Sequence, residues 1–314
     1  MLQAQRSTCN TLPQCSNIVL IFAGTEKPPR RTAMIHYGGF PEGNPAIETS
    51  PVVILPVPYD GTSTWVKGAD KGPEALLHAS ANMELYDIET DSEVWKVGIH
   101  TDAPVTANAS PEAMVEAVRE RVDALLQQKK FVVTLGGEHS VTIGAVQAYA
   151  QHWPDLTVLQ IDAHSDLRPE YEGSPNNHAC VMSRVADILP FVQVGIRSMD
   201  VEELDYMDRS RVVFAEEIQR SRNWISRVIN NLSSNVYVTI DLDAFDPSVM
   251  PSTGTPEPGG LLWYQVIGLL REVNENANIV GFDVVELCPN PNNKAPDFLA
   301  SKLLYKLLSY KFNR

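Results

Sequence analysis

The chain has 314 residues, 44% of them hydrophobic, and its 25 Lys and Arg against 39 Asp and Glu give a formal charge of −14. This length and apolar content allow a large buried core in a single α/β domain. The sequence holds no apolar run of about 18 residues, so we expect no membrane-spanning helix and no membrane partner. The acidic balance argues against a nucleic-acid partner, because phosphate binding depends on clustered Lys and Arg, and it favours small cationic molecules and metal ions.

The cysteines indicate a reducing compartment. Cys9, Cys15, Cys180 and Cys288 form no CxxC pair. The sequence therefore predicts neither a disulfide framework nor a thiolate zinc site, and we expect a cytoplasmic protein.

Residues 1–33 differ in composition from the rest of the chain. No acidic residue precedes Glu26, and the apolar run 18–23 is short for the core of a signal peptide. We prefer to interpret this segment as a disordered extension or the product of an upstream start, with a transit-like peptide or a cleaved signal peptide as alternatives. Organellar targeting thus stays open. From Met34 onward the composition is ordinary, and we expect residues 34–314 to form a single domain.

From residue 51 onward, short runs rich in Val and Ile alternate with amphipathic segments of helical length. The predicted strands are 52–57, 95–100, 131–135, 157–162, 191–196, 211–215, 236–241 and 279–287. The predicted helices are 73–86, 111–129, 140–152, 178–188, 216–231, 261–274 and 296–310. Ser110 followed by Pro111 is typical of a helix start. This alternation predicts a three-layer α/β/α sandwich around a mainly parallel sheet of about eight strands.

Acidic residues and histidines follow four of the predicted strands at the point where each strand ends. After "FVVTL" comes "GGEHS", after "TVLQI" comes "DAHSD", after "VYVTI" comes "DLDAFDP", and "IVGFDVV" runs into Glu286. In an open parallel sheet, ligands bind beyond the carboxyl ends of the strands. We therefore expect the four sets to meet at one edge of the sheet.

The "DAHSD" segment places Asp162, His164 and Asp166 at alternate positions directly after an apolar run. Along an extended strand these three side chains would share one face, and a face that carries them cannot belong to the core. The pattern indicates the end of the strand, where the chain can present ligands.

Six residues in these segments form a candidate metal site: His139, Asp162, His164, Asp166, Asp241 and Asp243. Four clustered carboxylates would raise one another's pKa steeply, and two divalent cations would neutralise them. Carboxylates with two imidazoles suit two Mn²⁺ ions better than a structural zinc, with Co²⁺ or Ni²⁺ as alternatives. Two such ions about 3.5 to 4 Å apart can activate a shared water, which predicts metal-assisted hydrolysis.

Each motif alone also fits a simpler interpretation. "GGEHS" could be a turn before a helix, "DLD" a solvated strand end, and "DAHSD" a solvated loop. Their joint occurrence at one predicted sheet edge favours a functional site.

Four segments resemble the ureohydrolases, the arginase and agmatinase family: "GGEHS", "DAHSDLRPEYEG", "IDLDAFDPSVMPSTGTPEPGGL" and "DVVELCP". They occur in the family's order, and the resemblance extends from about residue 50 to the C-terminus. It implies a parallel-sheet α/β sandwich, one catalytic domain, and a homotrimer or homohexamer. It also implies that one Mn²⁺ is held by His139, Asp162, Asp166 and Asp241, and the other by Asp162, His164, Asp241 and Asp243.

The resemblance implies catalytic roles for two further residues. Glu286 matches the acid that holds the substrate guanidinium, and a carboxylate can bind that planar fork through two hydrogen bonds. His178 matches the histidine that moves protons, and imidazole is suited to protonating a leaving amine. The alternatives are a surface acid for Glu286 and a capping or packing role for His178.

The substrate is predicted to be a small cationic guanidino compound, most closely agmatine, which would give putrescine and urea. Arginases carry Asn at the position of Arg168, whereas "DLRPEYEG" and "HACV" resemble the agmatinase branch. We expect Arg168 to pair with Glu170, Glu172 or a neighbouring subunit. Asn177, in the loop expected to meet the far end of the substrate, departs from the Ser common at that position. Guanidinobutyrate, arginine and free guanidine stay open, as does a non-catalytic binding protein on this fold.

Overall fold

The computed structural model describes residues 35–40 and 42–313. The prediction for residues 1–33 lies outside these residues. In the described part of the chain, no helix is both long enough and apolar enough to cross a membrane.

Eight parallel strands form one central sheet, as predicted. They are β1 (Val52–Val57), β2 (Ile99–Thr101), β3 (Phe131–Gly136), β4 (Leu156–Ile161), β5 (Phe191–Ile196), β6 (Val212–Phe214), β7 (Asn235–Asp241) and β8 (Asn278–Val285). Their order across the sheet is β2-β1-β3-β8-β7-β4-β5-β6, and every neighbouring pair is parallel. The strands β3, β8, β7 and β4 are consecutive neighbours, so their carboxyl ends lie together at one edge.

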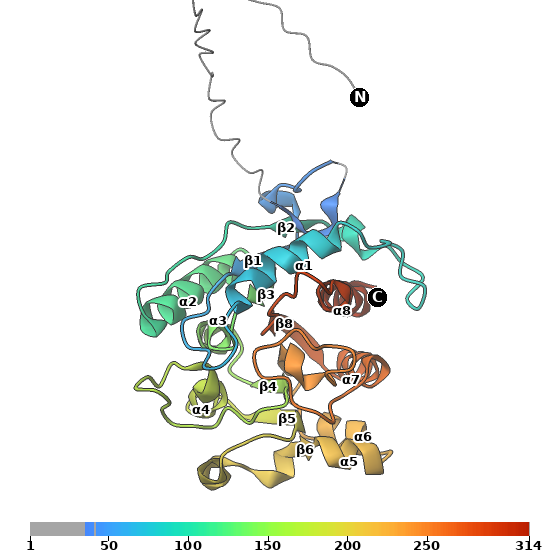
Figure 1. Cartoon of the computed structure of the whole chain (residues 1–314). Helices are drawn as coiled ribbons and strands as arrows, with labels where there is room; N and C mark the ends of the chain where they lie inside the picture. The colour runs from blue at the N-terminus through green and yellow to red at the C-terminus, as the bar shows by residue number, and fades with distance from the viewer. Residues whose placement is uncertain (1–34, 41, 314) are drawn as a thin grey trace, which may run out of the picture. The chain divides into compact units, whose positions relative to one another are not determined.

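Helices cover both faces of the sheet, which confirms the three-layer arrangement (Figure 1). The helices are α1 (Gly72–Ser80), α2 (Pro111–Gln127), α3 (Val141–His152), α4 (Val181–Ala186), α5 (Ala215–Arg220), α6 (Trp224–Ile229), α7 (Trp263–Asn276) and α8 (Ala295–Phe312). Buried side chains of α2, α3 and α4 pack on one face, and those of α1, α5, α6, α7 and α8 pack on the other. Because both faces are covered, every residue of β1 and of β4 is buried.

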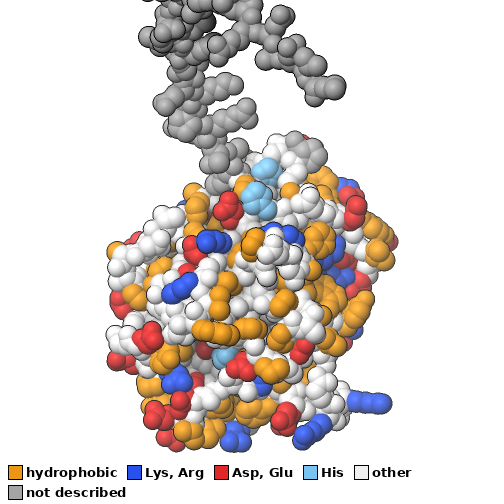
Figure 2. All heavy atoms as spheres, in the orientation of Figure 1, with side chains coloured by type: hydrophobic (Ala, Val, Ile, Leu, Met, Phe, Trp, Pro, Cys, Tyr) orange, Lys and Arg blue, Asp and Glu red, His pale blue; other side chains and the backbone are white. Residues whose placement is uncertain are grey.

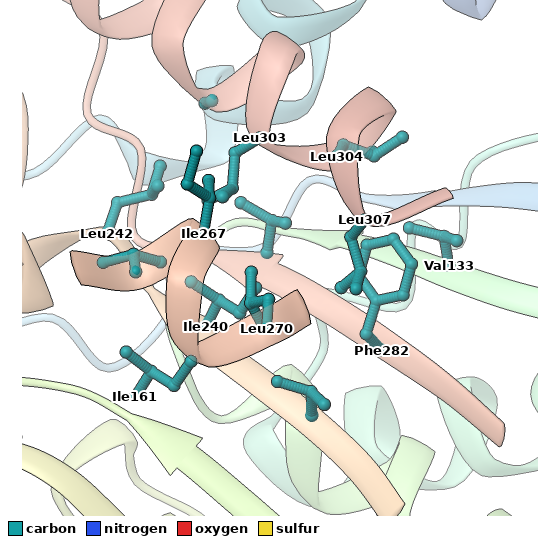
Figure 3. Close-up of a cluster of buried hydrophobic side chains, with 14 of the residues drawn as sticks. Val133, Ile161, Ile240, Leu242, Ile267, Leu270, Phe282, Leu303, Leu304 and Leu307 are labelled. Carbon is teal, nitrogen blue, oxygen red and sulfur yellow. The ribbon is translucent and has the colours of Figure 1, made fainter. Parts of the chain in front are cut away.

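Apolar side chains join α7 and α8 to the strands beneath them (Figure 3). Ile267 and Leu270 of α7 and Leu303 and Leu307 of α8 lie in one cluster with Phe282 of β8. Each is at most 5% exposed, and burying one such side chain contributes roughly 1.5 to 3 kcal/mol. This layer packs on β7 and β8, and both strands end at the edge where the acidic residues and histidines were predicted to gather.

Two predicted elements were wrong. Residues 95–100 do not form one strand, because a 3-10 helix (Val94–Val97) precedes β2 and the two are separated by Gly98 at φ +91°, a conformation that a strand cannot continue through. Residues 216–231 form two short helices instead of one, because Ser221 after α5 is extended, with φ −111° and ψ 137°. The predicted start of α2 is confirmed, since the Ser110 side chain accepts a hydrogen bond from the backbone of Ala113.

Acidic, basic and apolar side chains are interspersed on the face of the molecule shown in Figure 2. This face carries no extended basic stripe of the kind that binds nucleic acid.

Candidate active site

The edge formed by β3, β8, β7 and β4 carries the residues singled out in the sequence. His139 follows β3, Asp162, His164 and Asp166 follow β4, Asp241 ends β7, and Asp243 and Glu286 lie just beyond β7 and β8. All of these residues except the half-buried His164 are at most 7% exposed. The structure therefore brings the six predicted metal ligands and Glu286 together at one sheet edge.

The first group of possible ligands surrounds His139. Its Nδ1 lies 3.0 Å from Asp166 Oδ2, 3.1 Å from Asp162 Oδ2 and 3.3 Å from Asp241 Oδ2. This buried nitrogen has no hydrogen-bond partner among the described residues. An unpartnered imidazole nitrogen among three carboxylate oxygens is the donor set that a divalent ion requires.

The second group is centred on His164. Its Nδ1 lies 2.9 Å from Asp243 Oδ2 and 3.8 Å from Asp162 Oδ1. Asp162 belongs to both groups, in which the possible ligand atoms lie within 4.8 Å of one another. Asp241 lies with the first group, and its Oδ1 accepts the backbone N–H of Asp243.

The protein alone leaves these acids poorly compensated. Burial and the neighbouring Asp166 and Asp243 raise the pKa of Asp162 to about 7. Burial, with Asp243 and Asp162, also raises the pKa of Asp241 well above its usual value. Burial would lower the pKa of His164, but the nearby Asp243 outweighs it and raises that pKa to about 11. Two divalent ions would supply the missing positive charge, so these residues fit a binuclear centre.

Buried polar side chains orient the ligands. Gln160 donates from Nε2 to Asp162 Oδ2 at 2.7 Å, and the Thr239 hydroxyl lies 2.8 Å from His139 Nε2. Such contacts hold ligands in place and are part of a metal site. The sequence motifs did not point to either residue. Gln160 is a polar residue inside the apolar strand β4, and Thr239 is a polar residue inside the apolar strand β7.

A cavity of about 260 Å³ opens onto the two groups. It is lined by His139, His164, Asp166, Asp241, Asp243, Glu286, His178, Trp65, Tyr171, Arg168, Asp200, Glu203 and their neighbours. Its volume suits a small molecule that reaches the carboxylates at its floor.

Glu286 is held with its carboxylate toward this cavity. Its Oε1 accepts the backbone N–H of His139 at 2.8 Å, and its own N–H donates to Gly137 at 2.7 Å. The residue has φ +66°, a left-handed conformation that is uncommon outside glycine and recurs at functional sites. Burial and the nearby Glu138 raise its pKa well above the usual value, so a cationic partner would stabilise the ionised form.

His178 and Asn177 are neighbours with different surroundings. His178 lines the cavity and lies at the start of a short 3-10 helix, His178–Cys180, that leads into α4. Asn177 is 2% exposed, and its Oδ1 accepts the backbone N–H of Ala179. Its side chain therefore caps the short helix. Asn177 is not among the described residues that line the cavity, so this structure does not place it where the predicted contact with the substrate would be.

Within the chain, the expected pairing of Arg168 with Glu170 or Glu172 was wrong, and the pairing with a neighbouring subunit stays a prediction. Its Nη2 lies 3.2 Å from Asp200 Oδ2, its Nε lies 3.7 Å from Glu203 Oε1, and its guanidinium stacks 4.7 Å from the Tyr171 ring centre. Glu203 is in turn fixed by the backbone N–H groups of Leu167 and Asp200, each at 2.8 Å. The positive charge of Arg168 is thus compensated within the cavity wall.

Clustered carboxylate and imidazole groups beyond the carboxyl ends of parallel strands are typical of a metal-dependent hydrolase. The sequence profile of the Arginase family matches residues 50–309, and the chain belongs to this family of ureohydrolases, enzymes that depend on a binuclear metal centre and act on guanidino compounds.

Named relatives agree with this assignment. An N(1)-aminopropylagmatine ureohydrolase of Synechocystis sp. is 41% identical over 270 residues, covering 82% of this chain and 88% of the relative. An enzyme of the same name from Thermus thermophilus is 40% identical over 276 residues, which cover 87% of this chain and 94% of the relative. The crystal structure of agmatine ureohydrolase of Thermoplasma volcanium superposes with a TM-score of 0.80 at 30% identity. The superposition covers 90% of this chain and 95% of the Thermoplasma chain.

Proposed function

We propose that this enzyme hydrolyses the guanidino group of an agmatine-type substrate with a cationic amine tail, releasing urea and a polyamine. The favoured substrate is N(1)-aminopropylagmatine, because two relatives at 40% and 41% identity carry that name. Agmatine, predicted from the sequence, is the second candidate, and the similar Thermoplasma structure supports it.

The pairing of Arg168 with acids of the cavity wall is the observation that favours a substrate with an amine tail over one with a carboxylate tail. Arg168 already contacts Asp200, Glu203 and Tyr171, and two acids opposite one arginine leave this part of the cavity wall net negative. A substrate carboxylate would meet few available donors, at a cost of roughly 1 to 3 kcal/mol for a poorly satisfied polar group. An ammonium would instead be attracted by the acids of the cavity wall.

Glu286 is proposed to hold the substrate guanidinium. Its carboxylate accepts the backbone N–H of His139 and lines the cavity onto which both ligand groups open, and two parallel N–H donors of a guanidinium can bind it at once. This contact would place the guanidino carbon next to the six acidic and imidazole groups. The fixed Oε1 leaves little freedom for the carboxylate to turn away.

The six predicted ligands are proposed to hold two Mn²⁺ ions, which would supply a water-derived nucleophile at neutral pH. His178 is proposed to give a proton to the leaving amine, since a neutral amine departs more readily than its anion. Its position in the cavity wall, at the end of the loop that also carries Asp162, His164 and Asp166, supports that role.

Three further proposals accompany the reaction. Residues 34–314 would act as one catalytic domain, which the single sheet and the match over residues 50–309 support. The enzyme would assemble as a homotrimer or homohexamer, as the family resemblance implies. A cytoplasmic location is proposed from the use of cysteine in the sequence.

The test compares kcat/KM for N(1)-aminopropylagmatine, agmatine, arginine and 4-guanidinobutyrate at equal metal loading. We expect both amine-tailed compounds to exceed both carboxylates by about tenfold or more. Faster cleavage of agmatine than of the aminopropyl compound would favour the second candidate. Preference for a carboxylate-bearing compound would contradict the amine-tail proposal.

A further inference from the structure

We infer that Thr62 is a positioning residue for His178, and that its hydroxyl holds the imidazole at Nδ1 and leaves Nε2 free for proton transfer. This inference rests on the proposed role of His178 in protonating the leaving amine. The two residues come from the loop that follows β1 and the loop that precedes α4.

Thr62 contacts His178 at two points. The hydroxyl oxygen accepts the backbone N–H of His178 at 2.9 Å, and it lies 3.2 Å from Nδ1 of the same residue. Thr62 is 8% exposed, so water competes little for these contacts. One hydroxyl thereby fixes both the backbone and the ring of His178.

The two contacts of Thr62 leave one ring nitrogen of His178 available. They fall on the backbone N–H and on Nδ1, so neither contact occupies Nε2 of the imidazole. Nε2 is therefore the ring nitrogen that can give a proton to the leaving amine.

This arrangement gives Thr62 an effect on turnover and little effect on binding. Thr62 touches His178, whereas Glu286 is the proposed guanidinium partner. Loss of the hydroxyl would let the ring rotate away from this orientation. General acid catalysis contributes roughly a hundredfold or more, so we expect a misaligned acid to lower kcat about tenfold. KM should change by less than about twofold, because only the transition state uses the proton.

The test measures kcat, KM and metal content of Thr62→Val and Thr62→Ser against the unmodified enzyme, with N(1)-aminopropylagmatine and agmatine. We expect Val to lower kcat about tenfold and Ser, which keeps the hydroxyl, to restore most of it, with equal metal content in all three. If Val prevents folding, Thr62→Ala is measured in the same way and carries the same expectation.

Thr157→Val is the matched control. The Thr157 hydroxyl is also buried and makes a similar pair of contacts, donating to Ser233 Oγ at 3.0 Å and accepting the Ser233 backbone N–H at 3.1 Å. It lies near the amino end of β4, away from the catalytic edge, so this variant should lose stability and keep kcat. Unchanged kcat in Thr62→Val or Thr62→Ala, loss of metal in either, or failure of Ser to restore turnover would overturn the inference. Absence of urea release from the unmodified enzyme with every guanidino compound would instead refute the proposed function.

Discussion

Arg168 and Asp200 form an ion pair in the wall of the cavity, with Nη2 and Oδ2 3.2 Å apart. Their partners complete a small network in which Glu203 and Tyr171 also contact the guanidinium. We propose that this network makes the enzyme prefer substrates with an amine tail over substrates with a carboxylate tail.

Asp200→Asn should weaken the preference for amine tails. The change removes one acidic charge from the cavity and frees the Arg168 guanidinium to pair with a substrate carboxylate. We expect the kcat/KM ratio of agmatine to 4-guanidinobutyrate to fall about tenfold, which corresponds to one poorly satisfied polar group.

Asp208→Asn is the control for this change. Asp208 also lies at the start of a short helical turn and near an arginine, with Oδ2 3.8 Å from Arg211 Nε, and it is more exposed. Its loss should leave the substrate ratio unchanged. A ratio that is the same in Asp200→Asn and in the unmodified enzyme would contradict the role of the network.

Asp162→Asn should lose more metal than His139→Asn. Asp162 belongs to both ligand groups, with one oxygen 3.1 Å from His139 Nδ1 and the other 3.8 Å from His164 Nδ1, whereas His139 belongs to the first group alone. Elemental analysis after dialysis should therefore find both ions reduced in Asp162→Asn and mainly one in His139→Asn. Equal metal content in the two variants would show that Asp162 does not bridge.

Glu286→Gln should weaken substrate capture and retain both metals. The amide keeps the shape of the side chain but loses the charge that pairs with a guanidinium. A hydrogen bond to a charged group is worth roughly 1.5 to 3 kcal/mol, so kcat/KM should fall about tenfold to a hundredfold. Steady-state kinetics beside elemental analysis checks this, and loss of metal without a change in kcat/KM per bound metal would contradict it.

The clustering of the proposed ligands at one sheet edge could be predicted, because these residues follow apolar strands that are easily recognised. His139, Asp162 and Asp241 each end or follow a buried parallel strand, and parallel strands deliver their carboxyl ends to one edge. The buried polar residues that contact the proposed ligands were not predictable in the same way. Gln160 and Thr239 lie inside strands, and only the neighbouring strand determines what a polar side chain there contacts.

The partners of Arg168 show why local sequence was insufficient. Glu170 and Glu172 are near in sequence, but the structure pairs Arg168 with Asp200 and Glu203, more than thirty positions further along. These acids are placed by the loop and 3-10 helix after β5, and Glu203 is held there by backbone N–H groups. The route of a loop after a strand depends on such tertiary contacts and leaves little periodic signal in the sequence.

The buried cation Lys306 should make the stability of the fold depend on pH. Its Nζ lies 2.9 and 3.0 Å from the two carboxylate oxygens of Asp87 and 2.6 Å from Glu89 Oε2. Burial raises the pKa of both acids, but hydrogen bonds and attraction, first of all those of Lys306, outweigh it and lower both. A lowered pKa in the folded state adds stability above the unfolded pKa, about 4, and this stability is lost as the pH falls through the folded value.

Lys306→Met should therefore be destabilised most above about pH 5, with the gap to the unmodified protein narrowing toward pH 2. Removing one partner of a buried ion pair costs roughly 3 to 5 kcal/mol at neutral pH. Urea denaturation at several pH values measures the gap. Lys302 is the control, because its Nζ donates to the backbone carbonyl of Glu84 and makes no hydrogen bond to Asp87, so Lys302→Met should show a much smaller pH dependence. A gap for Lys306→Met that stays constant with pH would exclude the ion pair as its cause.

Titration of metal-free enzyme with Mn²⁺, followed by urea release from an amine-tailed guanidino substrate, tests the central claim most directly. Four buried carboxylates and two histidines in two groups that share Asp162 predict no urea release without metal and a rise to a plateau at two ions per chain. Thermal stability should rise over the same range, because ions that bind only the folded state stabilise it. Full urea release by verified metal-free enzyme, or a plateau at one ion per chain, would contradict the binuclear account.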